Sequence, residues 1–358
     1  MSLGWRRSRW HRRLALVAAA LLSAAISVAA AASGPSGPSQ GNGPQRYTIA
    51  LFGDMPYRDQ GRAEYPAVLD SINHAKIAFS VFDGDLKNGS ERCDDSLYTN
   101  SIAQFNTLTH PLVWVPGDND WTDCHRASNG GYDPIERLNH ERELFDATSQ
   151  SLGEHTLTLA RESSEGGQYA LYSENVRWSL GPVVYVGLNV QGSNDNFPHD
   201  GVDGEPIDRG ADPTAEIARE DAEHTAREQA NIHWLQESFA AATQQHARAV
   251  LIAWQGDPNF GNEMHLADPR SYDGFTGVVN ELRTETLAFP GQVVLVHGDS
   301  HYYKIDKPLL SPSGKVLANF TRVETFGSKN NHWVSADIDP KDPNVFTFRP
   351  QIVPANAG

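Results

Sequence analysis

Residues 293–303 of the chain read VVLVHGDSHYY, an apolar run that stops abruptly at His297, Gly298 and Asp299. The same ending occurs in IALFGD (49–54), FSVFDGD (79–85), LVWVPGD (112–118) and LIAWQGD (251–257). Short apolar runs rich in β-branched and aromatic residues predict buried strands, because these side chains favour the extended backbone. Strands that repeatedly end in Gly-Asp predict a common arrangement at one edge of a sheet.

The segments between these runs predict helices that alternate with the strands. The first part of the folded chain reads as a strand at 47–52, a helix at 62–76, a strand at 77–82, a helix at 95–108 and a strand at 112–115. A hairpin within 169–190, a charged helix at 213–244, strands at 247–254 and 292–296, and antiparallel strands towards the C-terminus are expected to follow. This alternation indicates an α/β fold with a parallel or mixed sheet, in which ligands collect at the carboxyl ends of the strands.

The first 45 residues differ in kind from the rest. Five arginines precede a run of Ala, Leu and Val from Leu14 to Ala32 that ends in small residues, which predicts a signal peptide at 1–32. Residues 33–45 are rich in Gly, Pro and Ser and are expected to form a flexible linker, with the folded domain at 46–358. The alternative is a retained membrane anchor, but an alanine-rich run is weakly apolar. We therefore expect a secreted or periplasmic protein with no stable membrane partner after cleavage.

The charge of the chain argues against polyanionic partners. Outside the predicted signal peptide, 24 Lys and Arg side chains stand against 45 Asp and Glu side chains. A surface this acidic repels DNA, RNA and anionic lipid, and the sequence shows no local basic patch that would reverse the repulsion. We therefore expect no nucleic-acid partner.

The chain has two cysteines, Cys93 and Cys124. In an exported protein an even number of cysteines predicts a disulfide bond, and the alternative is a pair of free thiols. Cys93 follows the Gly-Asp pair at 84–85, and Cys124 follows the pair at 117–118. A bond between them would connect two loops at strand ends.

The Gly-Asp pairs are the main candidate functional residues in the sequence. Glycine permits a tight departure from the strand, and aspartate supplies a hard anionic oxygen there. Gathered at one sheet edge, these carboxylates would repel one another and would call for cations. The simpler alternative is that each aspartate caps the helix or turn that follows it. The five aspartates are Asp54, Asp85, Asp118, Asp257 and Asp299.

In order and spacing these segments resemble the calcineurin-like metallophosphoesterase superfamily, whose motifs are D-x-H, G-D-x-x-[DN], G-N-H-[DE], a His at a strand end, and G-H-x-H. The corresponding segments are DMP (54–56), GDLKN (84–88), GDND (117–120), WQ (254–255) and GDSH (298–301). The resemblance implies a four-layer αββα fold, a β-sandwich of mixed sheets flanked by helices. It also implies a phosphoesterase that uses two divalent metal ions. The metal ligands that it implies are Asp54, Asp85, Asp118, Gln255, Asp299 and His301.

Several motif positions depart from the family pattern. Pro56 and Gln255 stand where metal-binding histidines are expected, Asp118 replaces an asparagine, and Asp299 replaces the first histidine of the last motif. Oxygen ligands in place of imidazole favour Mn²⁺ or another hard ion (Mg²⁺, Ca²⁺ or Fe) over Zn²⁺. The same departures would also fit a decayed site. The alternative function is therefore a catalytically inactive binding protein with at most one structural metal ion.

The catalytic and substrate-binding candidates surround these motifs. Asn119 stands where the family has its catalytic histidine, and an amide cannot protonate a leaving group. His297 could replace that histidine if its side chain faces the site, and Asp120 would orient a neighbouring group. Lys87 and Arg92 are expected to bind the phosphate oxygens of a small-molecule phosphate ester, because Lys and Arg bind such oxygens well.

Three further positions carry weaker signals. Arg126 could also meet phosphate oxygens, although it fits ordinary solvated surface equally well. Tyr57, in GDMPY (53–57), is expected to be a buried aromatic. The polar segment NVQGSNDN (189–196) follows a predicted strand and has the polarity of an active-site loop.

Cleavage of the signal peptide is directly testable. The mature protein should begin between Ala30 and Gly34, because the small residues that a signal peptidase accepts lie there. N-terminal sequencing of protein from the exported fraction measures this start. Recovery of Met1 from a membrane fraction would contradict the prediction.

Overall fold

The computed structural model describes residues 45–197, 213–258, 260 and 274–357. The predicted signal peptide (1–32) and all but the last residue of the predicted linker (33–45) lie outside these residues. The division of the chain into signal peptide, linker and domain therefore stays a prediction. None of the described helices combines the length and the apolar character that crossing a membrane requires.

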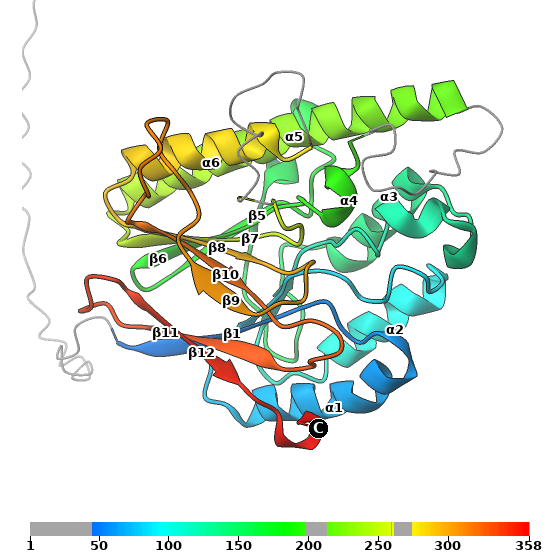
Figure 1. Ribbon diagram of the computed structural model, residues 1–358, viewed down its shortest axis with the longest axis horizontal. Helices are drawn as coiled ribbons and strands as arrows, with labels where there is room; N and C mark the ends of the chain where they lie inside the picture. The colour runs from blue at the N-terminus through cyan, green and yellow to red at the C-terminus, as the bar shows by residue number, and fades with distance from the viewer. Residues whose placement is uncertain (1–44, 198–212, 259, 261–273, 358) are drawn as a thin grey trace, which may run out of the picture. The chain divides into compact units, whose positions relative to one another are not determined.

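The described strands form two sheets (Figure 1). They are β1 Tyr47–Phe52, β2 Ser80–Phe82, β3 Leu112–Trp114, β4 Ala160–Arg161, β5 Val176–Leu180, β6 Val183–Gly187, β7 Ala249–Ala253, β8 Gln292–His297, β9 Lys304–Asp306, β10 Phe320–Glu324, β11 Trp333–Ile338 and β12 Phe346–Gln351. The five-stranded sheet has the order β12-β11-β1-β2-β3, in which β1, β2 and β3 are parallel. The seven-stranded sheet has the order β4-β5-β6-β7-β8-β10-β9, in which β6, β7, β8 and β10 are parallel.

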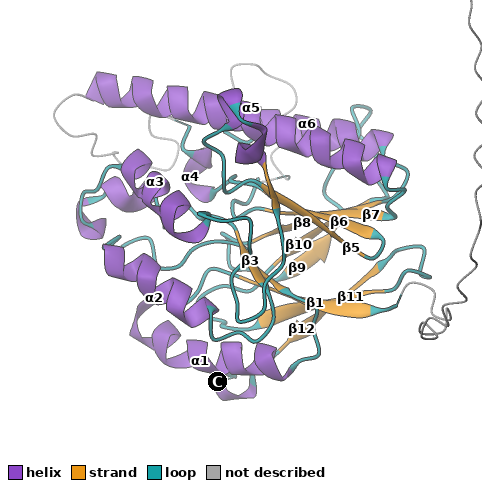
Figure 2. Cartoon of the chain, turned by 180° about the vertical axis from the view of Figure 1, so that it is seen from behind, coloured by secondary structure: helices purple, strands orange, loops and turns teal. Residues whose placement is uncertain are grey.

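Helices cover the outer face of each sheet. They are α1 Arg58–His74, α2 Asp95–Phe105, α3 Pro134–Phe145, α4 Gly192–Asp195, α5 Pro213–Gln244 and α6 Thr276–Ala288, with short 3-10 helices at η1 Thr122–His125, η2 Ala127–Asn129, η3 Glu162–Glu165, η4 Gly167–Tyr169 and η7 Pro354–Asn356. In Figures 1 and 2, α1 and α2 lie against the five-stranded sheet, and α5 and α6 lie against the seven-stranded sheet. This confirms the predicted four-layer αββα fold of mixed sheets flanked by helices.

The apolar runs are continuous because both faces of each central strand are buried. In β8, Val294 and Val296 pack into the core between the sheets, whereas Val293 and Leu295 pack against α5 and α6. Strands β1 and β7 divide their side chains in the same way. Successive side chains of a strand point to opposite faces, so a strand in the middle of four layers needs apolar residues throughout.

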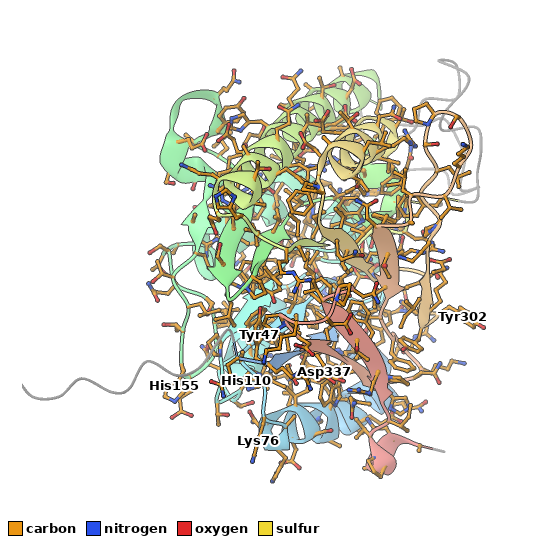
Figure 3. All side chains as sticks on the ribbon, turned by 90° about the vertical axis from the view of Figure 1, so that its left-hand side faces the viewer. Tyr47, Lys76, His110, His155, Tyr302 and Asp337 are labelled. Atoms are coloured by element: carbon orange, nitrogen blue, oxygen red, sulfur yellow. A yellow bond between two sulfur atoms is a disulfide. The ribbon has the colours of Figure 1, made fainter. Side chains whose placement is uncertain are left out.

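Polar contacts also join the sheets at the edge of this core. The Tyr47 hydroxyl, on β1, donates to the carbonyl of Leu180 at 2.6 Å and lies 2.8 Å from the Tyr185 hydroxyl. Both partners belong to the seven-stranded sheet. Figure 3 labels Tyr47 at this junction.

The ends of the predicted elements differ by a few residues, and the direction of one strand differs from the prediction. The helix predicted at 62–76 begins at Arg58, and the strand predicted at 77–82 begins at Ser80. Strand β10, expected to be antiparallel, pairs in parallel with β8 and antiparallel only with β9. The chain leaves β8, runs back along β9 and reverses again, which gives β10 the direction of β8.

Helices α3 and α6 were not predicted. For α3 the sequence carries a usable signal, because the Asp133 side chain accepts hydrogen bonds from the N–H groups of Ile135 and Glu136, with Pro134 in the first turn. An Asp N-cap followed by proline is a common start of a helix. Helix α6 has no side-chain cap at Phe275 and offers no such signal.

A disulfide bond joins Cys93 to Cys124, as predicted. Cys93 lies in the loop after β2, Cys124 lies in η1 after β3, and both are fully buried. The bond therefore connects the two loops that follow Asp85 and Asp118.

Stability measurements can test the contribution of this bond. The bond closes a loop with a sequence separation of 31 residues, so we expect its removal to lower the free energy of unfolding by roughly 3 kcal/mol. Urea denaturation of the wild type with and without reductant measures the difference. The double variant Cys93→Ala/Cys124→Ala is the control and should match the reduced wild type. Two titratable thiols in the denatured, unreduced protein would contradict the bond.

Candidate active site

Aspartates of the Gly-Asp pairs lie close together at the carboxyl ends of strands from both sheets. Asp54 and Asp85 follow β1 and β2 of the five-stranded sheet, and Asp299 follows β8 of the other sheet. The Asp299 N–H donates to Asp54 Oδ2 at 3.1 Å, although the two residues are 245 positions apart. Asp257, after β7, donates its N–H to Asp299 Oδ2 at 2.9 Å. The structure therefore brings Asp299 next to Asp54 and to the Asp257 backbone. The role of Asp54, Asp85 and Asp299 as metal ligands stays a prediction.

At Gly117 and Gly298 a neighbouring carboxylate approaches the glycine closely. A Cβ on Gly298 would lie 1.9 Å from Asp54 Oδ2, and a Cβ on Gly117 would lie 2.1 Å from Asp85 Oδ1. At Gly117 the Cβ would also lie 2.4 Å from Asp85 N, so no larger residue fits there unless the backbone moves. Asp54, Asp85 and Asp299 have left-handed φ values of 51°, 67° and 73°, which aspartate tolerates better than most residues. Close packing at the strand ends thus accounts for the glycines at 117 and 298.

Asp85 is the most heavily hydrogen-bonded carboxylate of the group. Its Oδ2 accepts from the Tyr57 hydroxyl at 2.6 Å and from Asn119 Nδ2, and its Oδ1 accepts from the Asn119 N–H at 3.1 Å. The Tyr57 hydroxyl also lies 3.4 Å from Asp54 Oδ1. Tyr57 is a buried aromatic, as expected, but the sequence analysis missed its contacts with two site carboxylates. The motif GDMPY was the available signal.

Negative charge accumulates where these aspartate side chains lie close together. Burial raises the pKa of Asp85 well above its usual range, and the charges of Asp118 and Asp54 raise it further. Burial raises the pKa of Asp299 in the same way, with an added contribution from Asp118. Asp118, which follows β3, is next to Asn119, whose N–H donates to Asp85 Oδ1 at 3.1 Å, so Asp118 also lies at these strand ends. Carboxylates so close together favour protonation or a bound cation.

Asp120 holds two of the loops in place. Its Oδ2 accepts from the N–H groups of Asp85 at 3.0 Å and Gly117 at 2.9 Å, and its Oδ1 accepts from the Leu86 N–H at 2.7 Å. Burial raises the pKa of Asp120 to about 7. Because both oxygens are occupied by backbone donors, the geometry favours the orienting role expected for Asp120.

The two histidine candidates differ in their surroundings. His301 Nε2 lies 3.4 Å from Asp54 Oδ1, and the side chain is 28% exposed. Burial opposes protonation of His301, but the contact with Asp54 outweighs it, so that the pKa is raised. His297 is fully buried, its Nδ1 bonds the Gly298 carbonyl at 2.9 Å, and its Nε2 has no hydrogen-bond partner. Burial lowers the pKa of His297, which favours the neutral ring.

Of the two substrate-binding candidates, only Lys87 lies in the group. Lys87 is 2% exposed, and its Nζ donates to the Asn88 carbonyl at 3.3 Å. Burial lowers the pKa of Lys87, while the charges of Asp120 and Asp123 oppose this effect. The Arg92 side chain is 58% exposed and pairs with Asp94 at 2.9 Å, on the outer side of the loop. Arg92 is therefore not brought to the site.

Gln255 connects the group to the segment after β6. Its side chain is fully buried, and its Oε1 accepts from the Gly192 N–H at 2.6 Å. Its Nε2 is buried without a hydrogen-bond partner. A Cβ on Gly84 would lie 2.6 Å from Gln255 Cγ, so the side chain lies directly against the loop of Asp85.

Ser193 is a site residue that the sequence analysis did not single out. Its Oγ lies 2.7 Å from Asp118 Oδ2 and 3.0 Å from Asp123 Oδ1. Asp123 in turn pairs through Oδ2 with Arg126 Nη1, and burial raises the pKa of Asp123 to about 8. A chain of polar contacts thus runs from Asp118 to the half-exposed Arg126. The only sequence signal was the polarity of residues 189–196.

The donor set fits a hard cation in its chemistry but not as a preformed cage. Asp118 Oδ1 is buried without a hydrogen-bond partner, and carboxylate oxygens are the ligands that Mn²⁺, Mg²⁺ and Ca²⁺ prefer. Both oxygens of Asp85, however, are engaged by Tyr57 and Asn119. Within the part of the chain that the structure describes, no group of three or more His, Cys, Asp or Glu side chains is arranged to hold a metal ion.

No protein-family model and no curated protein sequence matches the chain. Among solved structures, a purple acid phosphatase from yellow lupin seeds is similar, with 10% identity, coverage of 86% of this chain and 52% of that chain, and a TM-score of 0.45. A 5′-nucleotidase from Candida albicans has 12% identity, coverage of 85% and 50%, and a TM-score of 0.42. The anchor in the inner membrane complex of Plasmodium has 10% identity, coverage of 86% and 89%, and a TM-score of 0.40.

Replacing Gly117 by alanine tests the close approach at the strand ends. A Cβ there would lie 2.1 Å from Asp85 Oδ1 and 2.4 Å from Asp85 N, so the backbone must move. We expect Gly117→Ala to lower the free energy of unfolding by roughly 1–3 kcal/mol, measured by urea denaturation.

Gly277→Ala, in α6, is the matched control. The three atoms nearest to its Cβ belong to the end of the Glu228 side chain, whereas those at Gly117 include the backbone of Asp85. Alanine also favours the helix by about 1 kcal/mol over glycine. Equal losses of stability in the two variants would refute the steric explanation of the Gly-Asp pairs.

Proposed function

We propose that the chain is a metal-dependent phosphoesterase that hydrolyses a phosphate mono- or diester of a small molecule. The observation that carries the proposal is the convergence of carboxylates from four strand ends, the buried Asp54, Asp85 and Asp118 and the half-buried Asp299. Burial and the charges of Asp118 and Asp54 raise the pKa of both Asp85 and Asp299. Export to a secreted or periplasmic location is part of the proposal. The disulfide bond supports it, since such bonds persist in oxidising compartments.

The proposed ligands supply mainly oxygen donors. They would be Asp54, Asp85, Asp118, Asp299 and His301, with Gln255 beside them. Four carboxylates match the charge of two divalent cations. When bound, such cations would activate a water molecule and stabilise the charge that develops on the phosphoryl group. The scarcity of imidazole and the absence of thiolate ligands in this set favour Mn²⁺ over Zn²⁺.

Side chains of the chain itself would bind and orient the substrate. Lys87 is a buried cation next to the carboxylates, and Arg126 is a half-exposed cation at their border. Both could bind phosphate oxygens, Arg126 through the part of its guanidinium that Asp123 leaves free. Asn119 and Tyr57 fix the orientation of Asp85 by their hydrogen bonds. Neither nitrogen of Asn119 can protonate a leaving group, so esters with good leaving groups would be preferred.

A non-catalytic binding protein is the second candidate, and one observation favours it. The Asp85 carboxylate is already satisfied by three protein hydrogen bonds, from Tyr57, the Asn119 side chain and the Asn119 backbone. A carboxylate satisfied in this way does not need a metal ion. Metal analysis and turnover measurements on the same preparation separate the two candidates. Two bound ions with turnover support the enzyme, and one ion or none without turnover supports the binding protein.

Metal replacement and one substitution test the proposed enzyme. Bound metal ions are first removed with a chelator. Mn²⁺ should then restore the activity on an aryl phosphate better than Zn²⁺, because the proposed ligands are mainly carboxylates. Asp85→Asn should reduce this activity by about 100-fold or more, since an amide cannot supply the charge. Aryl phosphates should be hydrolysed at least about 10²-fold faster than alkyl phosphates, because no acid assists the leaving group.

Asp337→Asn is the control for the substitution, because Asp337 on β11 contacts Thr48 and Arg349 away from the site. It should leave the activity unchanged. Full activity of Asp85→Asn, or turnover supported by Zn²⁺ alone, would overturn the proposed site. Absence of turnover with every metal ion would support the binding protein.

A further inference from the structure

The turn after β6 has an unusual backbone. Ser193, Asn194, Asp195 and Asn196 are consecutive and have φ values of 50°, 56°, 53° and 56°. None of them is glycine, and each left-handed residue costs free energy because its Cβ approaches the backbone. Such a run persists only where surrounding contacts hold it, and strained backbone of this kind is concentrated at functional sites.

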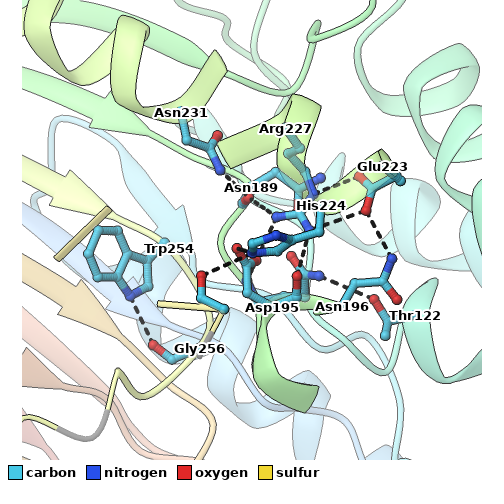
Figure 4. A network of polar contacts seen from close by, with 12 residues as sticks. Thr122, Asn189, Asp195, Asn196, Glu223, His224, Arg227, Asn231, Trp254 and Gly256 are labelled. Atoms are coloured by element: carbon cyan, nitrogen blue, oxygen red, sulfur yellow. Dashed lines mark hydrogen bonds and ion pairs between the residues drawn. The ribbon is translucent and has the colours of Figure 1, made fainter. Parts of the chain in front are cut away.

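A buried ion pair holds the centre of this turn. Arg227, on α5, is fully buried, and its Nη1 lies 2.5 Å from Asp195 Oδ1. Its Nη2 donates to the Asp195 carbonyl at 2.7 Å, and its Nη1 also donates to the Asn189 carbonyl at 3.0 Å. Figure 4 shows Arg227 between Asp195 and Glu223, whose Oε1 lies 2.7 Å from Arg227 Nε. The same guanidinium therefore binds both the side chain and the backbone of the turn.

Other contacts hold the flanks of the turn. The Gly274 N–H donates to Asn194 Oδ1 at 3.1 Å, and Asn196 Nδ2 donates to Glu223 Oε2 at 2.9 Å. His224 Nε2 lies 3.5 Å from Asp195 Oδ2, within the network of Figure 4. The turn is thus determined by its tertiary contacts and not by its own backbone preference.

The turn places the hydroxyl of Ser193 next to the cluster of site aspartates. Ser193 Oγ lies 2.7 Å from Asp118 Oδ2, while Asp118 Oδ1 stays buried without a hydrogen-bond partner. A Cβ on Gly192 would lie 2.9 Å from the Asp118 carboxyl carbon, so the turn packs directly on this carboxylate. Ser193 therefore engages one oxygen of Asp118, and the other oxygen has no hydrogen-bond partner among the residues that the structure describes.

We propose that Ser193 is a positioning residue, which fixes the Asp118 carboxylate so that Oδ1 can bind a cation, and that the Arg227–Asp195 pair maintains the strained turn for this purpose. The proposal rests on the proposed function, because it assigns Asp118 to cation binding. Outer partners of metal ligands orient them, and their removal commonly weakens metal affinity by about 10- to 100-fold.

A calorimetric titration with Mn²⁺ alone tests this role without any activity measurement. Bound metal ions are first removed from the protein with a chelator. Ser193→Ala and Ser193→Gly both remove the hydroxyl, but only the glycine relieves the left-handed backbone. We expect both variants to bind Mn²⁺ about 10-fold more weakly than the wild type. We expect the melting temperature of Ser193→Gly to be equal to or higher than that of the wild type. A purely structural residue would not combine weaker binding with unchanged or greater stability.

Ser101→Ala is the matched control, because the Ser101 hydroxyl only donates to the Leu97 carbonyl within α2. It should bind Mn²⁺ like the wild type. If the wild type binds Mn²⁺ and both Ser193 variants bind it equally well, the positioning role is wrong and the proposed metal site stands. If the wild type binds no Mn²⁺, the proposed metal site is wrong, and the positioning role is wrong with it.

Discussion

The hydrogen bond from the Asp299 N–H to Asp54 Oδ2 is the contact on which the site depends, because it joins the strand ends of the two sheets. Each sheet alone contributes only some of the aspartate side chains of the site. Side chains of β1 and β8 pack into the same apolar core between the sheets. The glycines at 117 and 298 then allow the carboxylates to approach neighbouring loops within a distance that any Cβ would prevent. The packing of the two sheets therefore also determines how the site carboxylates are arranged at the strand ends.

The sequence predicts those parts of the structure that depend on local pattern. The apolar runs ending at Asp54, Asp85 and Asp299 are recognisable because central strands of a four-layer fold are buried on both faces. The disulfide bond was predictable from the two cysteines together with the predicted export signal. The parallel direction of β10 was not, because it depends on how the chain passes through β9 and back. Pairing direction is a property of the whole sheet.

The missed site residues act through tertiary contacts that no short motif encodes. Tyr57 is separated by 28 residues from Asp85, and Ser193 is separated by 75 residues from Asp118. Their hydroxyl groups reach the carboxylates only after the loops have been placed by Asp120 and by Arg227. Lys87 and Arg92 illustrate the same limit, since both follow the same strand but only Lys87 turns inward. Residue type and proximity in sequence could not separate them.

The steric role of the glycines has a consequence for how far such a chain can diverge. A polar side chain at a strand end can be replaced by another while its backbone stays in place. A glycine beneath a neighbouring carboxylate has no such freedom, because every alternative side chain begins with a Cβ. The spacing of the strand-end glycines should then be harder to change than the polar residues beside them. Chains with the same arrangement of strand ends should be sought by that spacing, with the polar positions left open.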